Sequence, residues 1–383
     1  MRLSVLSVLL ASFAAWYNIG CFSPYLPLFA FETLGASHFM VGILTTVYWC
    51  SNTPSATLHG YIVDRYGKPR LILGIALLAL ALTDFTILLV STINDLVILR
   101  IIQGIVAAPI IPLTNLLASY ELGAGKGVGY VGSIGALGFL SGSVLGSILT
   151  LTPLRYVAVF LSAGFIILIS SLTVIISRGI IVDTRLETSR FKFEYLKHLP
   201  FTVWIVYIVM MFRQIGATGI WALFPLFVKD LGGNEFIVGL AFALNTISQV
   251  FFMRFVARYA EKWGLQVIAT GLILSTIVFI GYYLSYNYVH ILPLQILLGI
   301  SWSALTVGSN VHIIKNVRSE VRATALGLLM TFHGSSWVIG SYANSVISEV
   351  TKSLKEYMIL SSILTFTASL LIITVIFKLK RRE

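Results

Sequence analysis

The chain has 383 residues, of which 57% are apolar and only 11% carry a charge. This charged fraction is roughly half of that in soluble globular domains, so a water-exposed surface could hardly be built from it. The formal net charge of +11 comes from basic residues clustered between long uncharged runs. That distribution indicates membrane topology and excludes a nucleic-acid partner.

Long uncharged runs predict membrane-spanning helices. Residues 3–31, 127–154, 156–177 and 323–348 contain no Asp, Glu, Lys or Arg. A helix needs about 20 apolar residues to cross roughly 30 Å of hydrocarbon, where every backbone amide must bond within the segment. We therefore expect twelve spans, at residues 4–30, 38–63, 70–91, 95–118, 127–152, 155–177, 200–228, 236–258, 265–286, 289–315, 322–349 and 355–377.

The first sixteen residues also have the pattern of a signal peptide, with an early Arg and an apolar stretch. The uncharged run continues to Phe31, however, well past the apolar region of a signal. Residues 22–44 have a counterpart later in the chain that is a clear span. We expect the segment to stay in the mature protein as the first span.

The basic residues are distributed unevenly between the two sides of the predicted topology. With a cytoplasmic N-terminus, the inner loops and tails hold 20 of the 26 Lys and Arg residues. The outer loops hold only Arg155, Lys229, Lys352 and Lys355. This asymmetry follows the positive-inside rule. It predicts an integral protein of the plasma membrane with both termini in the cytoplasm.

An internal repeat divides the chain around a polar segment at residues 178–199. Gly35 and Gly232 differ by 197 positions, and so do Gly42 and Gly239. Parallel repeats of this kind place a substrate site near the membrane midplane between the repeats. The predicted fold class is an all-α membrane protein of two pseudo-symmetric six-helix bundles. The expected parts are an N-terminal bundle at 1–177, a cytoplasmic linker at 178–199 and a C-terminal bundle at 200–383.

The loop after the second expected span reads GYIVDRYGKPR, from Gly60 to Arg70. It resembles the loop motif of the major facilitator superfamily (MFS), and residues 257–264 repeat it in degraded form. Gly60 is expected to allow close helix approach, Asp64 to cap a helix or pair with a base, and Gly67 to permit a tight reversal. The resemblance implies a conformational latch between alternating states, formed by Gly60, Asp64, Arg65, Gly67, Lys68 and Arg70.

Two further patterns resemble MFS motifs. The fourth span carries RIIQG from Arg100, similar to a motif whose arginine assists coupling. The fifth span carries glycines at intervals of three and four, a small-residue face for close helix packing. It is similar to the antiporter motif, although Ser143 stands where that motif has a proline. The six glycines are Gly129, Gly132, Gly135, Gly138, Gly142 and Gly146.

Three full charges lie well within expected spans: Asp84, Arg100 and Arg213. Each costs at least about 2.5–3.5 kcal/mol there unless it is paired or hydrated. At 1.5 Å per residue, Asp84 lies roughly 13 Å and Arg100 roughly 10 Å below the outer boundary, so the two can pair. Asp84 and Arg100 are therefore either a structural pair or the groups that couple transport to protons.

Arg213 lies at the centre of the seventh span, with no acidic residue in that span to neutralise it. In a hydrated cavity it would attract an anionic group, while midplane aromatic residues met an apolar body. The alternative is that Arg213 bonds backbone carbonyls or reaches Asp84. The expected substrate-binding residues are Arg213, Trp16, Tyr17, Asn18, Trp302, Gln214 and His333.

The preferred function is secondary active transport of a small organic solute by alternating access, with protons as the coupling ion and an amphiphilic organic anion as substrate. A multidrug-type efflux carrier of apolar or cationic compounds is the alternative. A polytopic enzyme or a non-transporting sensor would be a different class; no catalytic constellation and no phosphate-binding loop supports an enzyme or ATP-driven transport. We expect a monomer in the lipid bilayer without cofactor or metal, and Cys21 and Cys50 as packing residues.

Overall fold

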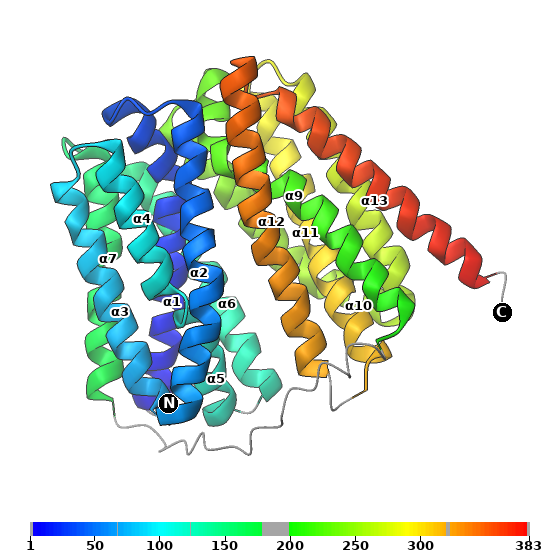
Figure 1. The fold of residues 1–383 in the computed structure, drawn as a ribbon, viewed down its shortest axis with the longest axis horizontal. Coiled ribbons are helices and arrows are strands. Elements are labelled where there is room, and N and C mark those ends of the chain that lie inside the picture. Colours follow the sequence, from blue (N-terminus) through cyan, green and yellow to red (C-terminus); the bar gives the residue numbers. More distant parts are fainter. Residues whose placement is uncertain (1–2, 67, 123, 178–198, 319–321, 381–383) are drawn as a thin grey trace. The chain divides into compact units, whose positions relative to one another are not determined.

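A computed structural model describes residues 3–66, 68–122, 124–177, 199–318 and 322–380 (Figure 1). All regular elements in these ranges are helices, and none is a strand. The first group is α1 (Leu3–Leu28), the π-helix η1 (Phe29–Thr33), α2 (His38–Tyr66), α3 (Pro69–Phe85), the 3₁₀ turn η2 (Thr86–Leu89), α4 (Ile93–Ala107), α5 (Ile110–Leu122), α6 (Ala124–Leu149) and α7 (Arg155–Ile176). The second is α9 (Phe201–Asp230), α10 (Glu235–Leu284), α11 (Tyr288–Asn316), α12 (Arg322–Thr351) and α13 (Glu356–Lys380).

The chain forms two compact units, each with its own apolar core. Unit 1 comprises residues 1–189 and 238–240, and unit 2 comprises residues 190–237 and 241–383. Residues 178–198 lie outside the described part of the chain. The boundaries of the predicted bundles and linker therefore stay a prediction.

In unit 1, α1 packs against α5, α6 and α7, while α3 packs on α7 and α2 on α4. The glycines of α6 explain how closely α1 can approach. A Cβ atom added at Gly138 or Gly142 would collide with the α1 backbone at Phe13 or Tyr17. The predicted small-residue face is thus confirmed from Gly135 to Gly146. At the two other glycines of the pattern, Gly129 and Gly132, a Cβ would meet open space.

In unit 2, α9 packs against α11, α12 and α13. Its closest approach is to α12, where a Cβ added at Gly219 would collide with the backbone of Gly340. Polar side chains bridge the same two helices, because Asn344 Nδ2 donates to the Gly219 carbonyl at 2.7 Å and Thr218 Oγ1 donates to the Ser336 carbonyl at 2.8 Å. The α9–α12 contact therefore holds the part of α9 that follows Arg213.

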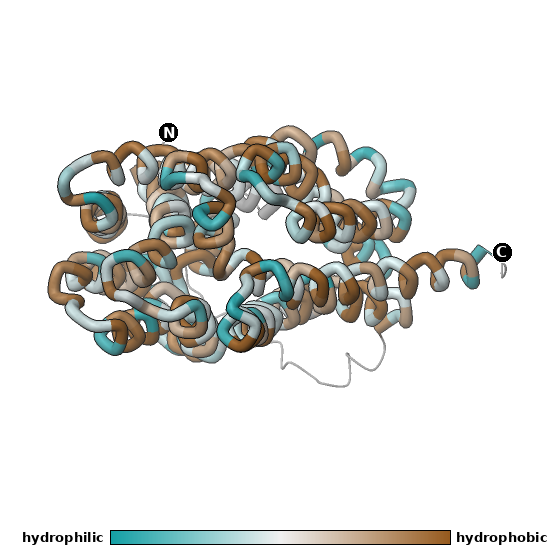
Figure 2. The backbone as a smooth tube through the Cα atoms, turned by 90° about the horizontal axis from the view of Figure 1, so that it is seen from above, coloured by the Kyte–Doolittle hydropathy of each residue, from teal (hydrophilic) through white to brown (hydrophobic). Residues whose placement is uncertain are grey.

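Nine helical stretches in the described ranges are long and apolar enough to cross a membrane. The fold class is confirmed as an all-α membrane protein, and Figure 2 shows brown, hydrophobic residues in all parts of the described chain. Neither α2 nor α12 is among the nine, because polar residues interrupt both helices. The count of twelve spans stays a prediction.

Three expected spans differ from the observed elements. The span predicted at 95–118 is two helices, α4 and α5, which meet at Pro109, a residue that has no amide hydrogen for a continuous helix. The spans predicted at 236–258 and 265–286 both lie within the 50-residue element α10, which is broken at Trp263 (φ −130°, ψ 51°).

The repeat appears in the backbone of the two units. Gly35 has φ +65° and Gly232 has φ +83°, so both adopt the left-handed conformation that favours glycine. Each lies just after the first long helix of its unit and just before the next one. The 197-residue offset in the sequence therefore corresponds to the same local turn in both halves.

Candidate functional site

Arg213 is the central residue of a buried polar cluster in unit 2. It lies on α9 and is only 3% exposed. Its Nε donates to Ser275 Oγ at 3.0 Å, and its Nη1 donates to Gln214 Oε1. Its Cζ lies 5.1 Å from the Trp302 ring centroid and 5.8 Å from that of Phe279. No hydrogen bond to Nη2 is found among the described residues.

The cluster continues from Gln214 to α12. Gln214 Nε2 lies 2.8 Å from His333 Nδ1, and Trp337 Nε1 donates to His333 Nε2 at 3.1 Å. The Trp302 ring lies 5.8 Å from the His333 ring, centroid to centroid. Four of the seven predicted substrate-binding residues, Arg213, Gln214, Trp302 and His333, therefore lie together. Ser275, Phe279 and Trp337 complete this set, which we call the Arg213 cluster.

Hydrogen-bond donors outnumber acceptors in the Arg213 cluster. Arginine and the indole of Trp337 can only donate, so Gln214 must accept from Arg213 through Oε1 and present its Nε2 donor to His333. A neutral imidazole has one acceptor nitrogen, yet donors face both nitrogens of His333. Arg213 also keeps donor positions on Nη2 for which no acceptor is found among the described residues, and an anion would supply one.

No acidic side chain balances Arg213 in the described part of unit 2. The ion pairs found there are confined to helix ends and do not include Arg213. The acidic residues described in unit 2 all lie near a helix end or the α10 break: Asp230, Glu235, Glu261, Glu349 and Glu356. Asp84, the alternative partner expected for Arg213, bonds to Asn18 and Gln103 of unit 1.

Asp84 is the centre of a second buried cluster, in unit 1. It is 0% exposed and lies near the end of α3. Asn18 Nδ2 donates to its Oδ2 at 2.6 Å, and Gln103 Nε2 donates to its Oδ1 at 2.9 Å. Asn18 was predicted to bind substrate, and the structure places its amide on this carboxylate instead.

Gln103 lies between Asp84 and Arg100. Arg100 Nη1 donates to Gln103 Oε1 at 2.8 Å, and Arg100 Cζ lies 4.1 Å from the Tyr48 ring centroid. No direct Asp84–Arg100 ion pair is found, although both residues are described. The two charged groups are therefore joined through one amide, and their role as a structural pair or as coupling residues stays a prediction. Gln103 belongs to the RIIQG pattern, which was the available sign of this role.

The aromatic residues predicted on the first span also lie in unit 1. Tyr17 is 2% exposed, and its hydroxyl lies 3.1 Å from Ser162 Oγ on α7, inside the bundle. Trp16 is half-buried beside Gly135 of α6. The structure thus places Tyr17 in the packing of unit 1, while Trp16 keeps a partly exposed ring.

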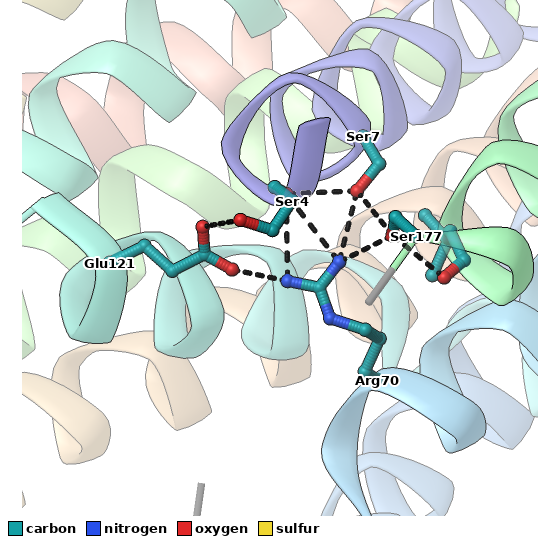
Figure 3. Close-up of polar contacts among 6 residues, drawn as sticks. Ser4, Ser7, Arg70, Glu121 and Ser177 are labelled. Carbon is teal, nitrogen blue, oxygen red and sulfur yellow. Dashed lines mark hydrogen bonds and ion pairs between the residues drawn. The ribbon is translucent and has the colours of Figure 1, made fainter. Parts of the chain in front are cut away.

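Arg70, predicted in the latch, lies in a cluster at one end of unit 1 (Figure 3). It pairs with Glu121 at the end of α5 and donates to Ser7 Oγ at 3.0 Å and Ser177 Oγ at 2.7 Å. Ser4 Oγ donates to Glu121 Oε2 at 2.6 Å. Residues of α1, α3, α5 and the end of α7 are therefore joined through one guanidinium. Sequence reasoning missed these four partners of Arg70, because they lie outside the motif and its residue spacing does not indicate them.

The rest of the predicted latch is only partly described. Gly60 has no neighbour where its Cβ would be, so the expected close approach at Gly60 is wrong here. Arg65 and Lys68 are exposed, and Arg65 Nη1 donates to Tyr61 Oη at 3.3 Å. The side chain of Asp64 and the whole of Gly67 lie outside the described residues.

Comparisons with known proteins agree with this architecture. An uncharacterized MFS-type transporter of Methanocaldococcus jannaschii is 22% identical over 362 residues, covering 91% of this chain and 92% of the relative. The quinolone resistance protein NorA of Staphylococcus aureus is 23% identical over 90% of each chain. Among solved structures, the nucleoside transporter NupG has a TM-score of 0.79 at 16% identity, over 99% of this chain and 100% of that one.

A second solved structure, a bacterial homolog of the human lysosomal transporter Spinster, has a TM-score of 0.81 at 12% identity, over 96% of this chain and 95% of that one. Both structures share the fold at low sequence identity. The sequence profile of the Major Facilitator Superfamily matches residues 8–341 and 206–383. The chain therefore belongs to the major facilitator superfamily and is an integral membrane secondary transporter rather than an enzyme.

Proposed function

We propose that this transporter carries an amphiphilic organic anion across the plasma membrane by alternating access. Arg213 Nη2 binds the charged group, and Trp302 and the other rings of the Arg213 cluster contact the apolar body. One observation carries the proposal: a buried guanidinium has no acidic partner in the described residues, and none of them accepts a hydrogen bond from its Nη2.

The energetics favour an anion at this position. An unpaired cation near the centre of a membrane helix costs at least about 2.5–3.5 kcal/mol. Neutral partners such as Ser275 Oγ and Gln214 Oε1, together with the Trp302 ring, offset part of this cost. A carboxylate on Nη2 would add a charge-assisted hydrogen bond and the missing acceptor. Binding would then offset more of the cost of burying the guanidinium.

A multidrug-type carrier is the second candidate, supported by relatives of similar identity. NorA and the multidrug resistance protein 1 of Bacillus subtilis, 24% identical over 358 residues, are both named for drug resistance. Half-buried rings at Trp302, His333 and Trp337 would also suit apolar or cationic compounds. The charge of the preferred ligand separates the two candidates.

A matched ligand series tests the proposal on purified protein. The series keeps one aromatic body and varies its polar group as carboxylate, primary amide or amine. We expect the carboxylate alone to raise the melting temperature, because a ligand at 100 times its Kd stabilises the folded state by about 2.7 kcal/mol. Equal stabilisation by the amine and the amide would contradict the anion and support the multidrug carrier.

Asp64 is proposed to act in the conformational latch and not in substrate binding, because it lies within the last three residues of α2. Asp64→Asn should slow transport roughly tenfold, a usual size for the coupling between conformational states. Equilibrium ligand affinity should stay within a few-fold, and Asp64→Glu is the conservative control. Loss of binding in folded Asp64→Asn protein would show that the latch assignment is wrong.

Protons are the proposed coupling ion, and Asp84 with Arg100 are the candidate residues. The geometry supports a structural role more than proton transfer. Asp84 has no exposed surface, and two amide donors already bond its carboxylate. A proton carrier needs a route to water in at least one state.

The cytoplasmic position of both termini is also part of the proposal, supported by the distribution of basic residues.

A further inference from the structure

The segment of α10 before its break at Trp263 carries an exposed surface that transport by the Arg213 cluster does not use. Three aromatic residues are exposed there: Phe251 (74%), Phe255 (53%) and Tyr259 (44%). Three basic residues, Arg254, Arg258 and Lys262, are exposed on the same segment. We call these six residues the α10 aromatic–basic face.

Helical geometry places the aromatic and the basic residues on one side of α10. At 100° per residue, all six positions fall within an arc of about 140°. Val256 and Ala260, which are buried, lie outside that arc and hold the opposite side of the helix in unit 2. The face is therefore a mixed surface of rings and cations and not an apolar stripe beside a separate polar one.

The rings of Phe255, Tyr259 and Trp263 form a ladder along the helix. The Phe255 and Tyr259 centroids are 5.1 Å apart, and the Tyr259 and Trp263 rings stack at 6.2 Å. Lys262 Nζ lies 5.0 Å from the Trp263 ring centroid. Trp and Tyr are typical of the membrane–water boundary, whereas Phe suits the hydrocarbon. This order suits a membrane boundary at Trp263 and hydrocarbon at the Phe end of the face.

The basic residues of this face form no ion pair with another described residue. None of the ion pairs found among the described residues involves Arg254, Arg258 or Lys262. Glu261 is the single acidic residue between Phe251 and Trp263. The segment therefore keeps a surplus of two positive charges at the membrane boundary.

We propose that the α10 aromatic–basic face binds an anionic phospholipid. The headgroup phosphate lies against Arg258 and Lys262, with Arg254 reaching the same level by extending its side chain, and one acyl chain lies along Phe251 and Phe255. The length agrees, because the eleven steps from Phe251 to Lys262 rise about 17 Å, close to half the roughly 30 Å of hydrocarbon. Basic clusters beside membrane helices attract anionic headgroups.

Native mass spectrometry of protein purified in detergent tests this site. The probes are phosphatidylglycerol and phosphatidylcholine, added in equal amounts. We expect wild-type protein to retain phosphatidylglycerol preferentially. The triple variant Arg254→Gln, Arg258→Gln, Lys262→Gln should lose roughly tenfold or more in that affinity.

The matched control removes the same charge from three exposed residues at other helix ends: Arg318→Gln, Lys378→Gln, Lys380→Gln. It should keep the lipid. An equal loss in both triple variants would overturn the site, because the effect would then reflect total charge alone. Equal retention of phosphatidylcholine by the wild type would overturn it as well.

A second measurement needs no loss of charge. Benzoylphenylalanine placed at position 259 should cross-link phosphatidylglycerol on illumination. The same group at Tyr283, which is 37% exposed on the other part of α10, should not. Cross-links from position 259 to the protein itself, or equal lipid capture at both positions, would contradict the proposal.

Discussion

Replacing Arg213 by Ala should weaken binding of a carboxylate ligand by roughly 10- to 100-fold. A hydrogen bond to a charged group contributes about 1.5–3 kcal/mol, and Nη2 is the donor that no described residue occupies. Arg213→Lys should keep part of the affinity, because it keeps the charge but not the planar fork of donors. Equilibrium binding by isothermal calorimetry measures the effect.

Folding must be measured on the same samples. Arg213→Ala leaves Ser275 and Gln214 without their donor, so a modest loss of stability is expected together with the loss of affinity. Arg155→Ala removes the same charge from an exposed site and should leave the affinity unchanged. A folded Ala variant that binds the carboxylate as well as wild type does would remove Arg213 from the site.

Asp84→Asn is expected to cost about 3–5 kcal/mol of stability, because breaking a buried charged network on one side leaves the other charge without compensation. The amides of Asn18 and Gln103 would then both donate towards the new amide at position 84, which is neutral. Arg100 would lose the negative charge to which Gln103 connects it. Thermal unfolding in detergent measures the loss. Adding Arg100→Gln should restore part of the stability, with an interaction energy of about 0.5–3 kcal/mol.

A role of Asp84 in proton coupling predicts a different result. Asp84→Asn protein would then fold normally, exchange substrate for substrate and fail to accumulate it against a gradient. Observation of that pattern, with no rescue by Arg100→Gln, would show that the structural role is wrong.

Sequence patterns were sufficient for the fold because a membrane helix must satisfy its own backbone over about 20 apolar residues. Uncharged runs such as 156–177 therefore mark helices directly, as α7 confirms. The exceptions have local causes. Pro109 divides the expected fourth span, and the backbone break at Trp263 lies inside one long assigned helix.

The two clusters were predicted only in part. Arg213 stands out in the sequence because it is the single charge between residues 198 and 228, and its neighbours Gln214, Trp302 and His333 were found with it. Tyr17 and Asn18 were not placed correctly, because their side chains turn towards Ser162 and Asp84 inside unit 1. Which side chains meet depends on how each helix is rotated about its own axis. The hydrophobic periodicity of α1 did not show this rotation, because α1 is apolar on every side.

Partners that are far apart in the sequence were missed for the same reason. Glu121 and Ser177 meet Arg70 across 51 and 107 positions. Ser275 meets Arg213 across 62 positions. Each pair joins two neighbouring helices at the same level along their axes. Residue spacing within one helix does not indicate which helices are neighbours.

Counterflow in proteoliposomes tests the central claim, that this chain is a secondary carrier with a substrate site at Arg213. Vesicles are loaded with the unlabelled carboxylate that gives the largest thermal stabilisation, and a trace of the labelled compound is added outside. A carrier should accumulate label transiently above its equilibrium level without any ion gradient, and Arg213→Ala should abolish this overshoot. Label that only equilibrates in wild-type vesicles, or an overshoot that Arg213→Ala preserves in full, would contradict the account.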